Sequence, residues 1–214
     1  MLQNESSTAT LESAAKSSQK PRVSLSREKI LEVATRLFAD SGYAAISIRD
    51  IASACQLSIP SIYHFFGDKE NLYLACCHYK FAEASLHLRA TLANAPAGVE
   101  RVRQFTVALC EVLMHQHEFR RLLQREILRE EQRSIDQFTQ HHFREELQAL
   151  SADIAELSDK DKALGLTFSI YAMVFGLVQL HRISASAGLD GELNGSPDSL
   201  ARHVLSTVLP TQRW

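Results

Sequence analysis

The chain has 214 residues, of which 45% are hydrophobic and 22% are charged, and its formal net charge is -2. This length suits one sizeable domain or a small domain joined to a larger one, and the hydrophobic fraction predicts a packed core. The charge balance excludes two classes of protein: those that coat nucleic acid and polybasic membrane binders. Any contact with a polyanion must therefore be local.

Cysteine usage and the N-terminal composition indicate the compartment. Cys55, Cys76, Cys77 and Cys110 have no CxxC spacing, which suits a reduced intracellular protein, and we expect them to be small core residues of a cytoplasmic protein. The first 22 residues are rich in Ser, Thr, Gln and Ala and lack the apolar stretch of a signal peptide. We therefore predict a disordered tail over residues 1–25.

The first predicted helix starts near Ser26 as its N-cap and ends at Gly42. Its apolar residues recur at helical spacing, so they share one face. That face comprises Ile30, Leu31, Ala34, Leu37 and Phe38.

Two short helices follow. Ser47 and Asp50 match a capping box that starts a helix ending around Cys55. Gln56 and Leu57 form the turn, and Ser58 caps a third helix that Gly67 closes. Pro60 is tolerated in the third helix because a first-turn amide has no intrahelical partner.

A long fourth helix is capped by Asp68 and runs from Lys69 to about Thr91, before the helix-breaking stretch 94–98. We expect it to bridge a small domain at 26–74 and a larger one at 75–214, held to the latter through Leu74, Phe81 and Leu86. Further helices are predicted near 99–116, 118–130, 134–157, 160–186 and 197–209. No window shows the alternation of a strand, so the fold class is all-α.

Residues 163–180 carry no formal charge and approach the length that spans a bilayer, but a buried helix is favoured and no membrane partner is expected. Small residues recur along this helix, and the last helix carries an apolar seam. They are Gly165, Ser169, Ala172, Gly176, Leu200, Val204 and Val208. They form a dimer interface or pack inside one subunit, since both arrangements give the same spacing.

Two short helices joined by a tight turn have the form of a helix-turn-helix, whose second helix enters the DNA major groove. On the third helix, Ile62, Phe65 and Phe66 are spaced to face inward. The remaining outward residues, with neighbours on the flanking helices, are candidates for contact with phosphates or base edges. The candidates are Ser47, Arg49, Ser58, Ile59, Ser61, Tyr63, His64 and Lys69.

The alternative for each of these residues alone is an ordinary hydrophobic corner or a solvated helix start. A modest basic edge favours the DNA interpretation. The segment 16–36 holds six lysines and arginines against two glutamates, a local charge of six minus two, or +4.

The stretch ILEVATRLFADSGYAAISIRDIASACQLSIPSIYHFFGDKENLY resembles the DNA-binding domain of TetR-family transcriptional regulators, over residues 27–74. The resemblance implies an all-α homodimer whose three N-terminal helices bind palindromic operator DNA. It also implies that the body binds a small-molecule effector that releases the repressor, and dimerises through its last two long helices. The sequence departs from the family at Gln56, where the turn usually has glycine, so the backbone there is strained or adopts a different turn. It also departs at Ile59 and Pro60, so Ile59 is expected to touch a thymine methyl rather than to make the usual base contacts.

The body holds candidates for the effector pocket, mostly apolar with a few polar groups. They are Met114, Phe119, Phe138, His141, Phe168, Tyr171 and Phe175, with Gln179 and Arg125 as further polar candidates. No HExxH, GxSxG or Gly-rich phosphate loop occurs, so no enzyme, catalytic residue, metal or cofactor is expected. Two alternatives remain: an all-α small-molecule-binding protein or enzyme that uses this pocket, and a protein-interaction module.

Overall fold

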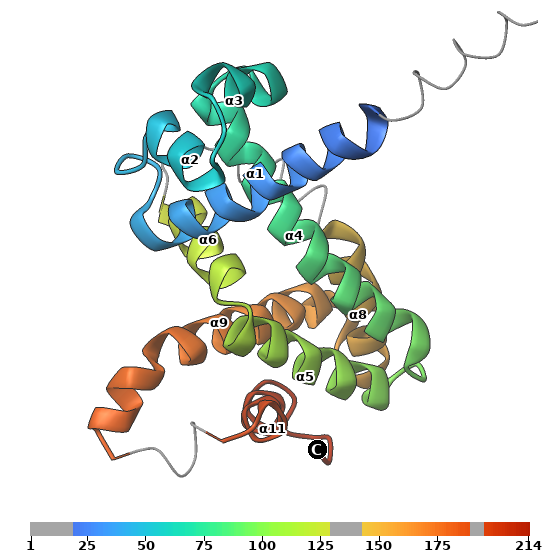
Figure 1. Cartoon of the computed structure of the whole chain (residues 1–214). Helices are drawn as coiled ribbons and strands as arrows, with labels where there is room; N and C mark the ends of the chain where they lie inside the picture. The colour runs from blue at the N-terminus through green and yellow to red at the C-terminus, as the bar shows by residue number, and fades with distance from the viewer. Residues whose placement is uncertain (1–18, 129–142, 189–194) are drawn as a thin grey trace, which may run out of the picture. The chain divides into compact units, whose positions relative to one another are not determined.

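The computed structural model describes residues 19–128, 143–188 and 195–214, and every regular element in these ranges is a helix (Figure 1). The predicted all-α class is confirmed. The chain divides into two compact units, Met1–Cys76 and Cys77–Trp214.

The first unit contains α1 (Gln19–Ser41), α2 (Ile48–Cys55), α3 (Ile59–Phe66) and the start of α4 (Lys69–Asn94). Helix α1 begins at Gln19 rather than near Ser26, so the predicted tail is wrong for residues 19–25. Pro21 lies in the first turn, where its missing N–H removes no intrahelical hydrogen bond. Residues 1–18 of that prediction lie outside the described residues.

The core of the first unit joins its helices through apolar side chains. Ile30, Ala34 and Phe38 are buried on α1, Ile51 is buried on α2, and Ile62 is buried on α3. The Phe38 ring packs edge-on against Tyr73, with ring centroids 5.2 Å apart. Two residues that we expected to face inward, Leu37 and Phe65, are only half-buried because they lie at the margin of the apolar face.

The turn between α2 and α3 contains a left-handed residue that is not glycine. Gln56 has φ 58° and ψ 42°. Its N–H donates to the Ser53 carbonyl at 3.1 Å, and the Leu57 N–H donates to the Ala52 carbonyl at 2.9 Å. This is the helix-ending motif that normally has glycine at its left-handed position. Of the two expected outcomes at Gln56, the structure therefore shows the strained one.

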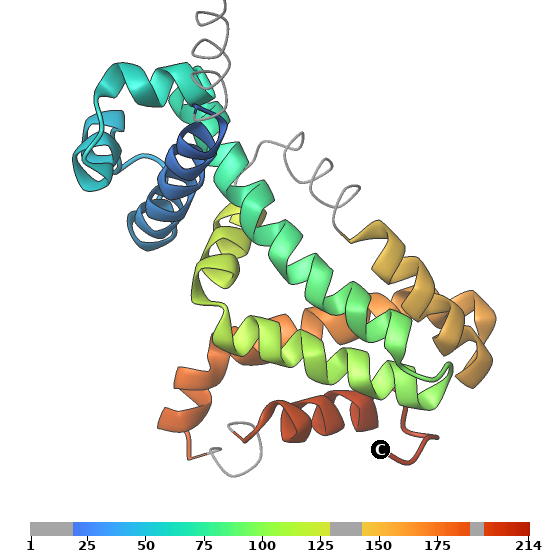
Figure 2. The same ribbon diagram turned by 45° about the vertical axis from the view of Figure 1, so that its right-hand side comes forward.

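The second unit contains the rest of α4, α5 (Val99–His115), α6 (His117–Leu128), α8 (Arg144–Leu157), a 3₁₀ turn η1 (Lys160–Lys162), α9 (Ala163–Ser186) and α11 (Pro197–Val208). Helix α5 packs against α8, α9 and α11, and Figure 2 shows α5 running beside α11. The N-terminal part of the helix predicted over 134–157 lies outside the described residues.

Two buried acids hold α8 in place. One oxygen of Glu146 accepts hydrogen bonds from the Ser85 hydroxyl and, at 2.8 Å, from Nε of Arg89, both on α4. Asp153 accepts from Arg101 at 2.6 and 2.7 Å and from the Gly98 N–H at 3.0 Å. Because both carboxylates are almost fully buried, these paired contacts fix how α8 packs.

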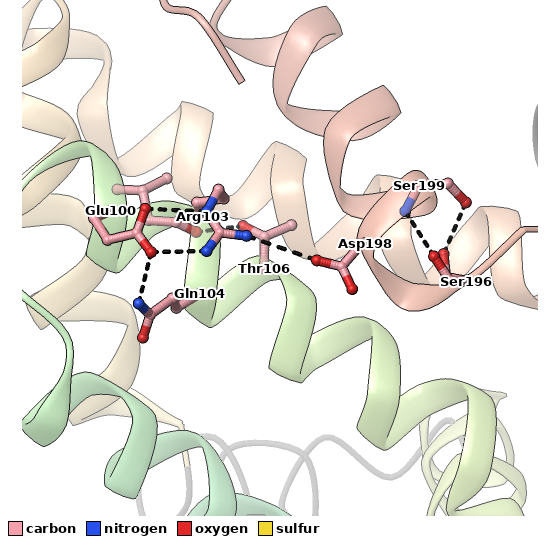
Figure 3. A network of polar contacts seen from close by, with 8 residues as sticks. Glu100, Arg103, Gln104, Thr106, Ser196, Asp198 and Ser199 are labelled. Carbon is pink, nitrogen blue, oxygen red and sulfur yellow. Dashed lines mark hydrogen bonds and ion pairs between the residues drawn. The ribbon is translucent and has the colours of Figure 1, made fainter.

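Helix α11 is fixed to α5 by polar and apolar contacts. In Figure 3 the Arg103 guanidinium lies between Glu100, at 2.7 Å, and Asp198, at 3.6 Å. Ser196 caps α11 by accepting the Ser199 N–H at 3.3 Å. Leu200 and Val204 are buried inside the subunit, and Val208 is half-buried. Placing Leu200 and Val204 in a dimer interface was therefore wrong, because the packing of α11 on α5 and α9 already covers the apolar seam.

Two further expectations concern α4 and the cysteines. Phe81 is buried, Leu74 is half-buried, and Leu86 is 71% exposed, so Leu86 does not hold α4 to the body. The four cysteines are buried, as expected of small core residues. Burial raises the pKa of the Cys76 thiol to about 12, so this thiol is not reactive near neutral pH.

Helix α9 has two different faces. Thr167, Ile170 and Val174 are buried, whereas Leu164, Leu180 and Ile183 are more than half exposed. The segment Lys160–His181 is long and apolar enough to cross a membrane by length and composition alone, with a hydropathy of 1.8. Only 28% of the 18-residue window that meets this test is buried. Within the described ranges, the expected buried helix is therefore covered on one face only.

Replacing Gln56 by glycine should stabilise the protein. Glycine removes a left-handed strain of about 1–2 kcal/mol and costs about 0.5–1 kcal/mol of additional unfolded-chain entropy. The melting temperature of Gln56→Gly should rise by about 2–4 °C. Gln56→Ala is the matched control, since it shortens the side chain without relieving φ. Equal melting temperatures for the two variants would contradict the strain.

Candidate nucleic-acid interface

The start of α2 is fixed by a complete capping box. The Ser47 hydroxyl accepts the Asp50 N–H at 3.2 Å, and the Asp50 carboxylate accepts the Ser47 N–H at 2.8 Å and its hydroxyl at 2.6 Å. The hydrogen bonds from the Ser47 side chain and backbone lower the pKa of Asp50 below its ordinary 3.8. These contacts hold Ser47 and Arg49 in a defined position at the surface.

The start of α3 depends on two serines. The Ser58 hydroxyl accepts the Ser61 N–H at 3.3 Å, and the two hydroxyls lie 2.7 Å apart. Pro60 occupies the first turn, where it displaces no hydrogen bond. Ile62 and Phe66 are buried, which turns Ile59, Tyr63 and His64 outward.

Residues of both short helices line one shallow surface hollow of about 460 Å³. It is formed by Ala44, Ala45, Ile46, Ser47, Ile48, Arg49, Ile59, Tyr63 and Lys69. Five of the eight residues predicted to bind DNA thus lie together, although they come from α2, α3 and the start of α4. Ile59 is 36% exposed and Tyr63 is 47% exposed, so both are accessible to a partner.

The other three predicted residues lie beside this hollow rather than in its lining. Ser58 and His64 are exposed on α3, and Ser61 is half-buried. The His64 ring packs against Phe65 with centroids 5.6 Å apart. These residues extend the same helix surface beyond the hollow.

Tyr43 orients Lys69, a role that the sequence did not suggest. The Lys69 ammonium lies 4.2 Å from the centroid of the Tyr43 ring, in a cation–π contact. Tyr43 also packs on Tyr73, with ring centroids 5.2 Å apart. The only sequence signal was an aromatic residue directly after Gly42, which could not show that its ring would meet Lys69.

The hollow can hold a polyanion and read part of its sequence. Arg49 and Lys69 supply positive charge, and the Tyr63 phenol supplies a donor for phosphate oxygens. Ile59 presents an apolar surface suited to a thymine methyl. This combination is typical of a helix-turn-helix lying on a duplex.

The second unit contains an apolar cavity of about 420 Å³. Four of the predicted pocket residues line it: Phe119, Phe168, Tyr171 and Phe175. Phe138 and His141 lie outside the described residues. Met114 lines a different, smaller hollow with Arg120 and His181, and Gln179 and Arg125 are not in the lining of the 420 Å³ cavity. Placing Met114 in the 420 Å³ cavity was therefore wrong: Met114 follows Leu113 directly on α5, but the two side chains line different hollows.

Two polar groups of this cavity are buried: the side chain of Glu126 and the hydroxyl of the half-buried Tyr171. Glu126 on α6 is 2% exposed, although nothing in the sequence singled it out. Burial, and then the charge of Glu146, raise the pKa of Tyr171, so its hydroxyl stays protonated. The cavity thus has an apolar body with a few polar groups, as ligand sites do.

The small-residue stripe of α9 lies at the surface of the subunit. Gly165 and Ala172 are exposed, and Ser169 and Gly176 are half-buried. A Cβ atom built on Gly165 or Gly176 would meet nothing within 4 Å. Ala172 also lines the 420 Å³ cavity.

Comparison with known proteins agrees with this geometry. The family model described as bacterial regulatory proteins, tetR family, matches residues 30–76 of this chain. The N-terminal domain belongs to the TetR family. Over 50 residues the chain is 50% identical to the HTH-type transcriptional repressor AcnR of Corynebacterium glutamicum. It is 28% identical over 91 residues to the HTH-type transcriptional repressor KstR2 of Mycolicibacterium smegmatis.

The extent of these matches differs. The AcnR match covers 23% of this chain and 27% of AcnR, so it spans about a quarter of that relative. The KstR2 match covers 42% of this chain and 44% of KstR2.

AibR, solved with isovaleryl coenzyme A and operator DNA, superposes with a TM-score of 0.66 at 21% identity, over 86% of this chain and 98% of AibR. A TetR family regulator from Marinobacter aquaeolei superposes with a TM-score of 0.72 at 20% identity, over 89% and 97%. The described helices therefore have a TetR-like fold in both units.

Removing the Ser47 hydroxyl should raise the pKa of Asp50 toward its ordinary value. Because the folded pKa of Asp50 is lowered, its charged form stabilises the fold above about pH 3.8, and this contribution is lost as the pH falls through the folded pKa. In an NMR titration Asp50 should titrate below 3.8 in the wild type and higher in Ser47→Ala. Ser53→Ala, an exposed change on the same helix, should leave the titration unchanged.

Proposed function

We propose that this chain is a ligand-responsive transcriptional repressor that binds a palindromic operator as a homodimer and is released by a small-molecule effector. The observation that carries the proposal is the hollow that brings Ser47, Arg49, Ile59, Tyr63 and Lys69 together on a TetR-family domain. Such a protein acts by binding alone, without catalysis, and works in the cytoplasm where its operator is.

In this function α3 is the recognition helix. Ile59 and Ser61, in its first turn, face base edges, while Tyr63, His64 and Lys69 hold the phosphate backbone. Ser47, Arg49 and Ser58 contact the same backbone from the starts of α2 and α3. The dimer presents two such helices about 34–36 Å apart, which matches one turn of DNA.

The exposed face of α9 supports the homodimer. Gly165, Ser169, Ala172 and Gly176 allow a second helix to approach closely, and Leu180 and Ile183 continue the same face as exposed apolar residues. Val208 is the remaining seam residue with surface exposure. A second copy covers this apolar surface, since a helix that is apolar nearly all round needs burial on both sides.

Effector binding in the 420 Å³ cavity supplies the regulation. Helix α4 carries Lys69 of the hollow and Phe81 and Leu88 of the cavity lining. An effector that binds one packing of Phe81 more tightly than another shifts the protein toward the conformation with that packing. If that conformation does not fit the operator, the operator affinity falls by the ratio of the effector's affinities for the two conformations.

The alternatives are a ligand carrier or enzyme that uses the cavity, and a module for a different protein partner. Both predict no salt-sensitive binding to duplex DNA. Selection of bound fragments from a random duplex pool separates them from the repressor. A recovered palindrome with half-sites about one helical turn apart supports the proposal, and a pool without enrichment at low ionic strength contradicts it.

Substitutions in the hollow should separate positioning from sequence reading. Lys69→Ala and Tyr63→Phe should weaken binding to every sequence, and Lys69→Ala should lower the salt slope by about one. Ile59→Ala and Ser61→Ala should instead change which base pairs are preferred. Competition binding with the selected operator and its single-base variants measures both effects. Glu83→Gln, an exposed change on α4 outside the hollow, is the control. If all four variants lost the same affinity for every DNA sequence, the separate roles in positioning and in base reading would be contradicted.

Charge placed on the exposed face of α9 should separate the dimer into monomers. The double variant Leu180→Asp and Ile183→Asp buries two unpaired charges in the proposed interface, so it should sediment at 24.0 kDa whereas the wild type sediments at twice that mass. Its operator affinity should fall with the dimer. Leu86→Asp is the control, because Leu86 is 71% exposed, more than Leu180 or Ile183, but lies on α4. A wild-type protein that sediments as a monomer would contradict the dimer.

A further inference from the structure

A smaller hollow of the second unit, of about 190 Å³, lies where α5 ends and α6 begins. Its polar lining residues are His117 and Arg120 of α6 and His181 of α9. Apolar side chains of α5, α9 and α11 form the rest: Met114, Leu177, Val178 and Leu200. No aspartate or glutamate is among the described lining residues. This space, called the Arg120 hollow below, therefore combines a positive charge with an apolar wall.

The Arg120 guanidinium has only neutral partners within the described part of the chain. Its Nη1 donates to the carbonyls of Leu113, at 2.6 Å, and Met114, at 3.3 Å. These contacts satisfy carbonyl groups in the last turn of α5. Its Nη2 donates to Nδ1 of His117 at 3.0 Å. Three of the five guanidinium N–H groups are thus used, and the Nε–H and one Nη2–H remain.

Donors of both α6 residues are available to a ligand. Arg120 is half-buried, and none of the buried side-chain atoms that lack a partner in the described ranges belongs to it, so its unused Nε–H keeps accessible surface. A guanidinium can only donate, so Nδ1 of His117 accepts and the ring proton is on Nε2. His117 is exposed, and its Nε2–H makes no hydrogen bond among the described residues.

The charge of Arg120 lacks the compensation that other arginines of this unit have. Burial, and then the charge of Arg121, lower the pKa of Arg120 below its ordinary value. Three other arginines show the opposite shift because each donates to a carboxylate: Arg89, Arg101 and Arg103. Nε and Nη2 of Arg101 donate to the two oxygens of Asp153 at 2.6 and 2.7 Å. A carboxylate beside Arg120 would stabilise its charge in the same way and accept from the unused N–H groups.

The apolar wall and the volume restrict the rest of the ligand. A space of 190 Å³ holds about six water molecules, so it suits an anion of a few heavy atoms. Inorganic phosphate would place its further charged oxygens against the four apolar side chains at a desolvation cost. A short hydrocarbon tail would instead bury apolar surface there.

We propose that the Arg120 hollow binds a small carboxylate anion with a short hydrocarbon tail, and that Arg120 and His117 donate hydrogen bonds to the carboxylate. This site is separate from the 420 Å³ cavity, since Leu113 and Phe119 line the cavity whereas Met114 and Arg120 line the hollow. None of the residues proposed for the dimer face lines the hollow, so one chain contains the whole site. The inference goes beyond the proposed function and does not depend on it.

Three probes with one alkyl chain and different heads test the site: butyrate, 1-butanol and butylamine. Each is titrated into the full chain at an ionic strength held constant with chloride, and NMR follows the Arg120 Nε–H and the Met114 methyl group. The Leu109 methyl groups report on the 420 Å³ cavity. Butyrate should shift the signals of Arg120 and Met114 and bind at least about tenfold more tightly than 1-butanol, because a hydrogen bond between charged groups is stronger. Butylamine should shift neither signal.

Two variants assign the donors. Arg120→Gln should lower the butyrate affinity at least about tenfold, followed at the Met114 methyl group. His117→Ala should lower it about threefold to tenfold, and it leaves the contacts of Arg120 with the α5 carbonyls in place. It therefore tests the site even if Arg120→Gln destabilises the fold. Arg202→Gln is the matched control: it removes the same charge from an exposed position on α11 outside the lining, and it should keep the wild-type affinity.

Several results would overturn the carboxylate site. They are equal affinities for butyrate and 1-butanol, butyrate shifts confined to Leu109, shifts that chloride alone reproduces, no shift with any probe, and wild-type affinity in both His117→Ala and Arg120→Gln. Selection of operator DNA is carried out without butyrate. A protein that selects a palindrome yet ignores butyrate would keep the repressor and lose this inference, and one that binds butyrate without selecting DNA would do the reverse.

Discussion

The left-handed turn at Gln56 is the constraint on which the proposed DNA-binding surface depends. It ends α2 and, with the Ser58 cap, sets the direction in which α3 begins. Only with that direction do Ile59 and Tyr63 share a hollow with Arg49. A glutamine holds this conformation at a cost in strain, which the core contacts of Ile51 and Ile62 outweigh.

In the second unit, buried acids have a comparable effect. Glu146 and Asp153 attach α8 to α4 and to the start of α5, and this packing places Phe143 and Leu147 in the wall of the cavity. Such pairs define one arrangement of helices, because either acid without its arginine would be a buried charge without a partner. Among the residues that the structure describes, Glu146 Oε2 and the Tyr171 hydroxyl have no hydrogen-bond partner.

Helix α9 links the two proposed roles of the second unit. One face, with Ile170 and Val174, belongs to the core, while Phe168 and Phe175 line the cavity. The stripe of small residues lies at the surface of the subunit, where we propose that a second copy packs. Ala172 belongs both to this stripe and to the cavity lining, so the proposed ligand site and the proposed dimer face share one helix.

The sequence alone determined the helices, the capping box at Ser47 and the outward residues of α3, because caps, glycine stops and apolar spacing act between residues close in the chain. It could not separate Leu200 and Val204, which are buried against α5, from a true dimer face, since both arrangements produce the same spacing. The contact of Lys69 with Tyr43 and the burial of Glu126 and Glu146 were likewise decided only by tertiary structure. The physical reason is that these contacts join residues on different helices. The packing of the helices decides which polar side chain becomes buried, and the periodicity of the sequence does not encode that packing.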